Sequence, residues 1–322
     1  MLKRFLIIAF LLTLNPKAIF GQQDPQFSQY YFNQQYYNPS VVSAESLPQI
    51  QVLHRSQYLG YVSNFDKGGT LNTQLLSFQM PLSKSKAGIG LVIINDQVGL
   101  EKNQQMRFSY AKNLKVSRGA LSVGVSAGFY NKSYNSNFRP RENNDPNIPA
   151  DGYSQIKPDF GLGVSYHAKY YFGAISINHI NSPKFDFGAD NGNNIINRNV
   201  TGIFGVNINV NQKLEIKPNV LLRSDLQTYT IEGGLLAEIG KKYWFGTNYR
   251  SQDAVILLAG ASLMSNKALK LGVAYDLVAV QQNIKSASSF EIMASYLIGS
   301  KNVRAAKAPA KIPIIRTPRY RH

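Results

Sequence analysis

The feature that most constrains the fold is an alternation of apolar with small or polar residues, repeated in segments of about ten residues. Residues 204–210 read FGVNINV, and residues 271–277 (LGVAYDL) and 121–126 (LSVGVS) repeat the pattern. Successive side chains of a β-strand point to opposite faces, so this spacing predicts strands with one apolar and one small or polar face. After residue 20, no segment approaches the roughly 18 consecutive apolar residues of a membrane helix.

The polar faces of these segments distinguish two classes of β protein. A soluble sandwich would carry many charges there, yet charged residues make up only 16% of the chain and Gly, Ser and Asn take their place. Alternating segments with aromatic residues towards their ends are typical of a transmembrane antiparallel β-barrel, in which closure removes edges that hydrocarbon would not tolerate. We therefore predict an all-β chain with a single barrel of about 14 strands. The predicted strands are 48–57, 70–80, 87–95, 102–112, 119–131, 157–167, 170–179, 199–210, 214–223, 227–238, 243–250, 254–263, 268–278 and 289–299.

The connections between these strands sort by parity. Those after even-numbered strands are short, whereas the two long connections, 132–156 and 180–198, follow odd-numbered strands. Outer-membrane barrels have short periplasmic turns and longer outer loops, so the parity predicts the outer membrane of a Gram-negative bacterium, with both termini in the periplasm. Each short connection contains or adjoins lysine: Lys84, Lys86, Lys115, Lys169, Lys213, Lys241, Lys242 and Lys267.

The first residues predict export. Lys3 and Arg4 precede an apolar run, 5–14, and Gly21 is a small residue at a plausible cleavage point, as in a secretory signal peptide. An uncleaved N-terminal anchor is the alternative. We divide the chain into a signal peptide (1–21), an N-terminal aromatic segment (22–47), a barrel (48–299) and a basic tail (300–322). Export means that the formal charge of +17 does not indicate nucleic-acid binding.

The N-terminal segment is a candidate plug. Residues 24–40 read DPQFSQYYFNQQYYNPS, with no charge between Asp24 and Glu45. A barrel of this size encloses more space than its own side chains fill, and aromatic rings with hydrogen-bonded hydroxyls could occupy the remainder. A periplasmic arm or partner-binding strand is the alternative. The candidate plug residues are Phe27, Tyr30, Tyr31, Phe32, Tyr36 and Tyr37.

This segment also resembles the opening signature of the PorP/SprF family of Bacteroidetes outer-membrane proteins, DPxFSQYxFNxxxxNPA. The residues that match are Asp24, Pro25, Phe27, Ser28, Gln29, Tyr30, Phe32, Asn33, Asn38 and Pro39. Ser40 replaces the alanine. The resemblance continues through His54, Arg55 and Gln57, and through the lysine-bearing turns.

The resemblance implies a non-enzymatic role in type IX secretion and gliding motility. Members of that family look like barrels that contact periplasmic machinery and assist the export or surface anchoring of an adhesin. For this chain it implies type IX secretion components as partners and a secreted adhesin at the outer loops, beside the lipid bilayer itself.

The basic tail departs from the family pattern in length and charge. Residues 301–322 contain seven positive residues and no acid, with three prolines. An extended cationic segment could bind a periplasmic or peptidoglycan-associated protein, ordering on contact; a solvated tail or one on anionic lipid is the alternative. The candidate partner-binding residues are Arg316, Pro318, Arg319 and Tyr320. The last three of these resemble a PRYF-like family ending, although Arg321 and His322 follow them.

Catalytic signatures do not occur in the sequence. The four histidines (His54, His167, His179 and His322) form no HExxH motif, and cysteine is absent. No nucleophile elbow or phosphate-binding glycine loop is present. We predict no enzyme, no catalytic residue, no cofactor and no metal. A porin or hydrophobic-substrate channel with an N-terminal plug is the alternative function.

Overall fold

The computed structural model describes residues 24–44, 46–58, 70–99, 101–116, 119–134, 154–186, 194–251, 253–264, 266–278 and 288–299. The predicted signal peptide and basic tail lie outside these residues, as do the middle parts of both long loops, 135–153 and 187–193. No helix among the described residues is long and apolar enough to cross a membrane.

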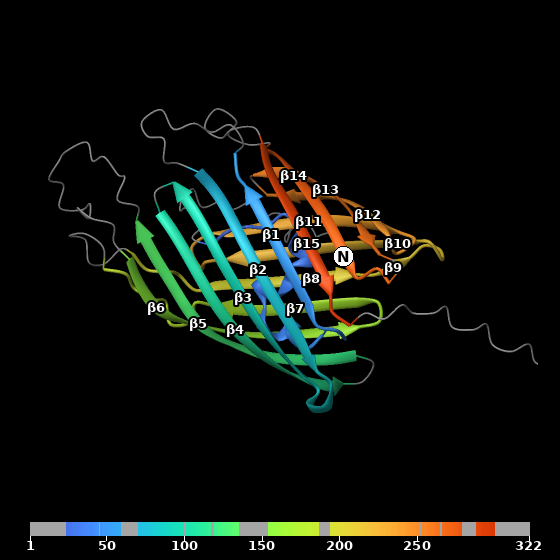
Figure 1. The fold of residues 1–322 in the computed structure, drawn as a ribbon, viewed down its shortest axis with the longest axis horizontal. Coiled ribbons are helices and arrows are strands. Elements are labelled where there is room, and N and C mark those ends of the chain that lie inside the picture. The colour runs from blue at the N-terminus through green and yellow to red at the C-terminus, as the bar shows by residue number, and fades with distance from the viewer. Residues whose placement is uncertain are drawn as a thin grey trace, which may run out of the picture.

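One antiparallel sheet closes on itself to form the wall of a barrel (Figure 1). Consecutive strands pair around the ring, and β1 pairs with β15 to close it. The strands are β1 (Gln49–Ser56), β2 (Thr70–Leu82), β3 (Ala87–Gly99), β4 (Glu101–Val116), β5 (Gly119–Tyr134), β6 (Ser154–Ala168), β7 (Tyr171–Asn178), β8 (Asn199–Val206), β9 (Ile208–Asn209), β10 (Leu214–Ser224), β11 (Tyr229–Ile239), β12 (Tyr243–Arg250), β13 (Ala254–Leu263), β14 (Leu269–Val278) and β15 (Ser288–Leu297).

The prediction of a closed antiparallel barrel with 14 strands is confirmed, with one difference. The predicted strand 199–210 is divided into β8 and the two-residue β9, which both pair with β10 in one register. The pairing stops at Asn219 opposite Gly205 and resumes at Ile216 opposite Ile208, so the stretch of β10 unpaired on this side is Lys217 with Pro218. Proline has no backbone N–H to donate, so the ladder is interrupted there and resumes below it.

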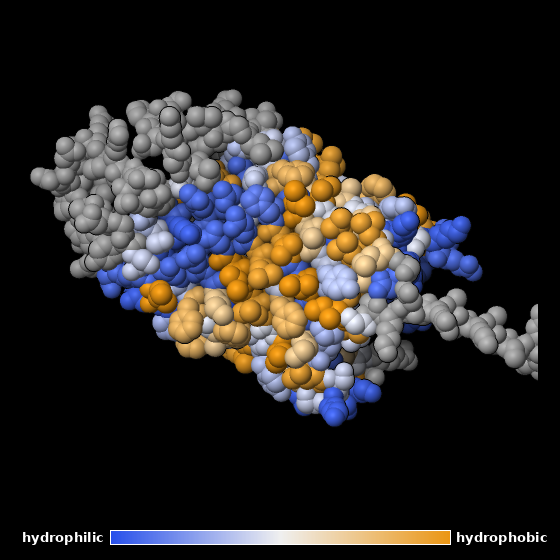
Figure 2. Space-filling view, in the orientation of Figure 1, coloured by the Kyte–Doolittle hydropathy of each residue, from blue (hydrophilic) through white to orange (hydrophobic). Residues whose placement is uncertain are grey.

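The two faces of the wall differ in chemistry, as the alternation predicts. Outward residues are apolar and exposed, for example Phe108, Ile175 and Phe245, whereas inward residues of the same strands, such as Ser109 and Ser176, are buried. Figure 2 shows the apolar side chains as a continuous area across the wall. An apolar outer surface around a polar interior is the arrangement of an outer-membrane barrel.

The N-terminal residues lie inside this wall (Figure 1). We call residues 24–44 the luminal segment. It contains η1 (Tyr30–Phe32), the short helix α2 (Gln34–Tyr37) and η2 (Pro39–Ser43). Asn38 caps η2, because its Oδ1 accepts a 2.8 Å hydrogen bond from the Ser40 N–H, and Pro39 sits at the first position, where no N–H is needed.

Glycines of the wall let the luminal segment approach it closely. A Cβ added at Gly124 on β5 would lie 2.5 Å from the Cα of Ser40, and one at Gly88 on β3 would lie 2.7 Å from the Cα of Ser43. Both obstacles are backbone atoms, which cannot rotate away. The segment is therefore fitted against β3 and β5 at contact distance.

This fit predicts that Gly124→Ala loosens the luminal segment. We expect a loss of about 1–3 kcal/mol of stability from overpacking, seen as faster proteolysis of the N-terminal residues in the folded barrel. Gly233→Ala is the matched control, since a Cβ at Gly233 meets nothing within 4 Å. Equal proteolysis of the two variants would contradict the prediction.

We name the two ends of the barrel the turn end and the loop end, after the connections between strands at each end. At the turn end, short segments join β2 to β3, β6 to β7 and β11 to β12; at the loop end, the longer segments join β1 to β2, β5 to β6 and β7 to β8.

Candidate functional site

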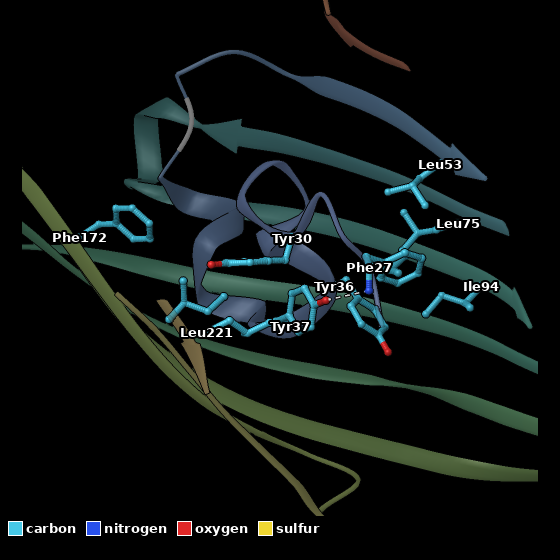
Figure 3. Packing of buried hydrophobic residues seen from close by; sticks show 11 residues of the cluster. Phe27, Tyr30, Tyr36, Tyr37, Leu53, Leu75, Ile94, Phe172 and Leu221 are labelled. Carbon is cyan, nitrogen blue, oxygen red and sulfur yellow. Dashed lines mark hydrogen bonds between the residues drawn. The ribbon is translucent and has the colours of Figure 1, made fainter. Parts of the chain in front are cut away.

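The candidate site is the luminal segment and the wall residues that hold it. Of the six candidate plug residues, Phe27, Tyr30, Tyr36 and Tyr37 are buried, and Tyr31 and Phe32 are partly buried. Figure 3 shows the first four grouped inside the wall, and they belong to one packed cluster with Leu53, Leu75, Ile94, Phe172 and Leu221 of the strands. The aromatic rings thus form one core with apolar side chains from strands on several sides of the lumen.

The ring contacts have the geometry that aromatic pairs prefer. Phe27 and Tyr36 meet edge to face with ring centroids 4.9 Å apart, and Tyr36 and Tyr37 are 4.7 Å apart. Phe32 packs on Trp244 of β12 at 5.1 Å. Offset and edge-to-face pairs each contribute about 0.5–1.5 kcal/mol beyond the burial of area.

The tyrosine hydroxyls of this core are hydrogen-bonded. Tyr36 donates to the carbonyl of Pro25 at 3.0 Å, and the Tyr37 hydroxyl accepts from the N–H of Phe27 at 3.3 Å (dashed in Figure 3). Tyr30 donates to the side chain of Asn219. Burial raises the pKa of Tyr37 to about 12, although the charge of Arg223 opposes this. These phenols remain neutral donors and acceptors at physiological pH.

A cluster of buried charges from the wall surrounds Ser28. The N–H groups of Ser28 and Gln29 donate to the two carboxylate oxygens of Glu291 at 2.8 and 2.9 Å. The Ser28 hydroxyl donates to Asp276 at 2.6 Å and accepts from Arg55 at 2.6 Å. Arg55 in turn pairs with Asp276 at 2.7 Å. Charged groups on β1, β14 and β15 therefore bind the segment through its backbone as well as its side chain.

Arg250 on β12 extends this cluster to the neighbouring strands. Its Nε lies 2.8 Å from Glu232 of β11, and its Nη1 lies 3.2 Å from Asp253 and 3.5 Å from Asp276. Glu232 also accepts from the Asn248 amide at 2.7 Å. The side chains of Arg250 and Glu232 are 1% and 2% exposed. Since buried charges are costly unless paired and hydrogen-bonded, each member of this cluster depends on the others.

A second set of contacts holds the first described residue, Asp24. His179, just after β7, lies between two carboxylates, with Nδ1 2.8 Å from Asp159 and Nε2 3.1 Å from Asp24. The Asn199 amide donates to Asp24 at 2.8 Å. Burial favours neutral forms, but the charge of Asp24 and the hydrogen bonds to both carboxylates outweigh it and raise the pKa of His179 to about 9. The same ion pair, with help from Arg223, holds the pKa of Asp24 well below its usual range despite burial.

This contact predicts a pH dependence for the attachment of Asp24. Because the folded-state pKa of His179 is about 9, against 6.5 when exposed, its stabilisation is complete below pH 6.5 and is lost as pH rises through 9. We expect on the order of 3 kcal/mol to disappear, at about 1.4 kcal/mol per unit of pKa. Proteolysis of the N-terminal residues should accelerate between pH 7 and pH 10, and His179→Gln should remove that dependence. A pH profile identical in both proteins would contradict this.

Further wall side chains hold the backbone of the luminal segment. Arg107 donates to the Tyr36 carbonyl at 2.8 Å and lies over its ring at 5.2 Å. Ser176 and Asn178 of β7 both donate to the Tyr37 carbonyl, at 2.8 and 2.9 Å. The amide of Asn38 donates to two wall carbonyls at 3.0 and 3.2 Å. The segment is therefore bound from opposite sides of the ring, not draped along one strand.

Little space remains in the lumen around this segment. A cavity of about 340 Å³ lies at the turn end, lined by Gln49, Gln79, Lys217 and Lys270 of the wall and by Asn33 of the segment. Beside Asp24 at the loop end, the space is about 20 Å³. Described parts of the 180–198 loop also cover that end, where Phe185 and Ile196 pack against Tyr130. The described lumen is thus a cup that opens towards the turns.

Of the charged residues around Ser28, only Arg55 belongs to the family resemblance described above, and none was predicted as a site residue. Their signal in the sequence is a charged residue at an inward strand position whose neighbouring inward positions are uncharged. Arg55, Glu232 and Glu291 each fit that description. Candidate tail residues Arg316, Pro318, Arg319 and Tyr320 lie outside the described residues. In the part of the chain that the structure describes, no group of three or more His, Cys, Asp or Glu residues could hold a metal ion.

Two solved structures share this fold. The Pseudomonas putida toluene transporter TodX superposes with a TM-score of 0.50 at 10% identity, over 80% of this chain and 92% of that one. The CymD monoaromatic hydrocarbon channel superposes with a TM-score of 0.50 at 12% sequence identity, over 86% of this chain and 93% of that one. At these identities the likeness concerns the fold alone.

Comparison with curated proteins finds no match. Comparison with protein families does: residues 19–296 match the family described as type IX secretion system membrane protein PorP/SprF. The match covers the luminal segment and nearly the whole wall, and it confirms the resemblance seen in the opening signature. The chain belongs to the PorP/SprF family of type IX secretion system membrane proteins.

Proposed function

We propose that this protein is a non-enzymatic, occluded outer-membrane barrel that anchors or assists the surface display of a secreted adhesin and contacts periplasmic type IX machinery. Family membership supports the link to secretion. The proposal of an occluded barrel is supported by the position of the luminal segment inside the wall. A cluster of buried charges on β1, β11, β12, β14 and β15 surrounds Ser28 of this segment. A barrel filled in this way is suited to hold partners and unsuited to pass solutes.

The proposed orientation places the turn end and both termini in the periplasm. Short turns on that side and longer loops on the other support it. The cup then opens to the periplasm, and the loops face the adhesin outside. The tail would leave the barrel beside the turns, where Arg316, Pro318, Arg319 and Tyr320 would contact a periplasmic or peptidoglycan-associated protein.

Co-purification from native membranes tests this proposal. The full chain, extracted in mild detergent, should bring down type IX components, and truncation after Lys301 should reduce the periplasmic ones while the barrel still inserts. Lys84→Gln with Lys86→Gln in the β2–β3 turn is the matched control for lost positive charge. Absence of every type IX component from the full-length sample would refute the proposal.

A channel for small apolar molecules is the second candidate, and its support is the fold shared with TodX and CymD. That function requires the luminal segment to move aside. Planar-bilayer recordings separate the two, because an occluded barrel gives no conductance steps. Uptake of an aromatic hydrocarbon by vesicles containing the full chain would favour the channel.

A further inference from the structure

The wall of the barrel is much taller on one side. β4 and β5 have 16 residues each and β6 has 15, whereas β12 has 8. A strand of about 9–11 residues crosses a membrane. At the loop end, residues 154–161 of β6 extend beyond its pairing with β7 while still pairing with β5, so the wall there rises above its neighbour.

A row of uncharged polar side chains crosses this taller wall on its outward face. Asn131 donates to Gln104 at 3.2 Å, Gln104 to Asn95 at 3.3 Å, and Asn95 to Gln74 at 3.3 Å. The hydroxyl of Ser154 donates to Asn131 at 2.8 Å. We call these five residues the amide ladder; they lie on five adjacent strands, β2 to β6.

The ladder keeps hydrogen-bonding capacity for something outside the wall. Asn95, Gln104 and Asn131 each use one N–H and one oxygen lone pair within the row. An amide has two N–H groups and two lone pairs, so each has a donor and an acceptor to spare. Figure 2 shows hydrophilic residues gathered on this part of the wall, directly beside the apolar area. Neutral amides with both donors and acceptors suit a ligand rich in hydroxyls.

One end of the ladder borders a cavity in the outer wall. This trough, about 500 Å³, is lined on one side by Gln74, Asn95 and His54 and on the other by Val52, Leu76, Ile93, Ile292 and Ala294. Ala294 pairs with Val52 on one side and Leu271 on the other, so its small side chain leaves a depression between larger ones. The trough therefore has an apolar side and a polar side. An amphiphilic ligand could place its hydrocarbon part against the first and its polar headgroup against the second.

We infer that the trough and the amide ladder bind one glycolipid of the outer leaflet, with an acyl chain in the trough and sugar hydroxyls on the ladder. The inference rests on the orientation under the proposed function, which places the loop end outside, where the leaflet carries lipopolysaccharide. Lys102 lies one position beyond Gln104 on the outward face and supplies a positive charge for an anionic group of the headgroup. A phospholipid would fill the trough equally well, but its small headgroup has too few hydroxyls to reach along the five strands of the ladder.

Lipid retention tests the inference. The full chain is reconstituted in nanodiscs that contain equal amounts of rough-type lipopolysaccharide and phosphatidylglycerol, and lipid that stays bound through detergent exchange is measured by mass spectrometry. We expect the native protein to retain lipopolysaccharide. Ala294→Phe, which fills the trough, and Gln104→Leu, which breaks the ladder, should each lower its retention about tenfold, the change that ~1.4 kcal/mol of binding produces.

Ala127→Phe is the matched control, since Ala127 is also an exposed outward residue but lies outside the trough. It should retain as much lipopolysaccharide as the native protein. Heat-modified mobility on gels verifies that all variants are folded barrels. Equal retention in all four proteins, or retention of phosphatidylglycerol in place of lipopolysaccharide, would overturn the inference. Co-purification of type IX components is measured separately, so failure of lipid binding is distinguishable from failure of the proposed function.

Discussion

Replacing Arg250 with methionine should lower the free energy of unfolding by about 3–5 kcal/mol, the cost of breaking a buried ion pair from one side. The substitution leaves Glu232 without its 2.8 Å partner and withdraws a second cation from Asp276. Neither carboxylate can reach bulk water. The midpoint of denaturant unfolding, followed by tryptophan fluorescence of Trp244, reports the change. Lys157→Met is the control, because its 3.8 Å pair with Asp186 is exposed and should contribute under about 1 kcal/mol.

The double variant Arg250→Met with Glu232→Leu tests the cause. If the loss comes from an uncompensated buried carboxylate, removing that carboxylate should restore part of the stability. A double variant as unstable as the sum of both single variants would show that Arg250 acts through packing and not through its charge.

Deletion of residues 24–44 should turn a closed barrel into a conducting one. The wall would persist, since its hydrogen-bond ladder closes through β1 and β15 without the luminal segment, and the charges that the segment covers would be hydrated by water in the lumen. Bilayer recordings should show conductance steps that the full chain lacks. Removal of the tail, 301–322, serves as the control and should leave the barrel closed. A deletion variant that folds but shows no conductance would mean that another part of the protein closes the lumen.

The wall could be predicted from the sequence to within a few residues per strand because its signal is local. The alternation in 271–277 or 121–126 can be recognised within about seven residues. It follows directly from the apolar surroundings outside the wall and the polar surroundings inside it. The one misjudged strand, 199–210, failed because its interruption comes from Pro218 on a neighbouring strand. No inspection of residues 199–210 by themselves reveals that neighbour.

The site was less accessible to prediction because its contacts join distant parts of the chain. The many aromatic residues and few charges of 24–40 predicted that this segment is buried. They did not predict which wall residues bind it. Glu291 meets Ser28 across 263 positions of sequence, and Asp24 meets His179 across 155. The position of Glu291 follows from the closing register, in which Arg55 lies opposite Glu291, whereas His179 follows β7, elsewhere in the ring. A single charge in a strand carries no information about such a partner.

The hydrogen bonds from Ser28 and Gln29 to Glu291 have a consequence for biogenesis. They join the luminal segment to β15, so this segment cannot be fully held until β15 is in place. Contacts of such long sequence separation form late. A chain arrested before this strand therefore still exposes the aromatic side chains of residues 27–37 to chaperones and proteases. In the finished barrel these side chains are buried or partly buried, so the accessibility of the luminal segment distinguishes an unfinished barrel from a finished one.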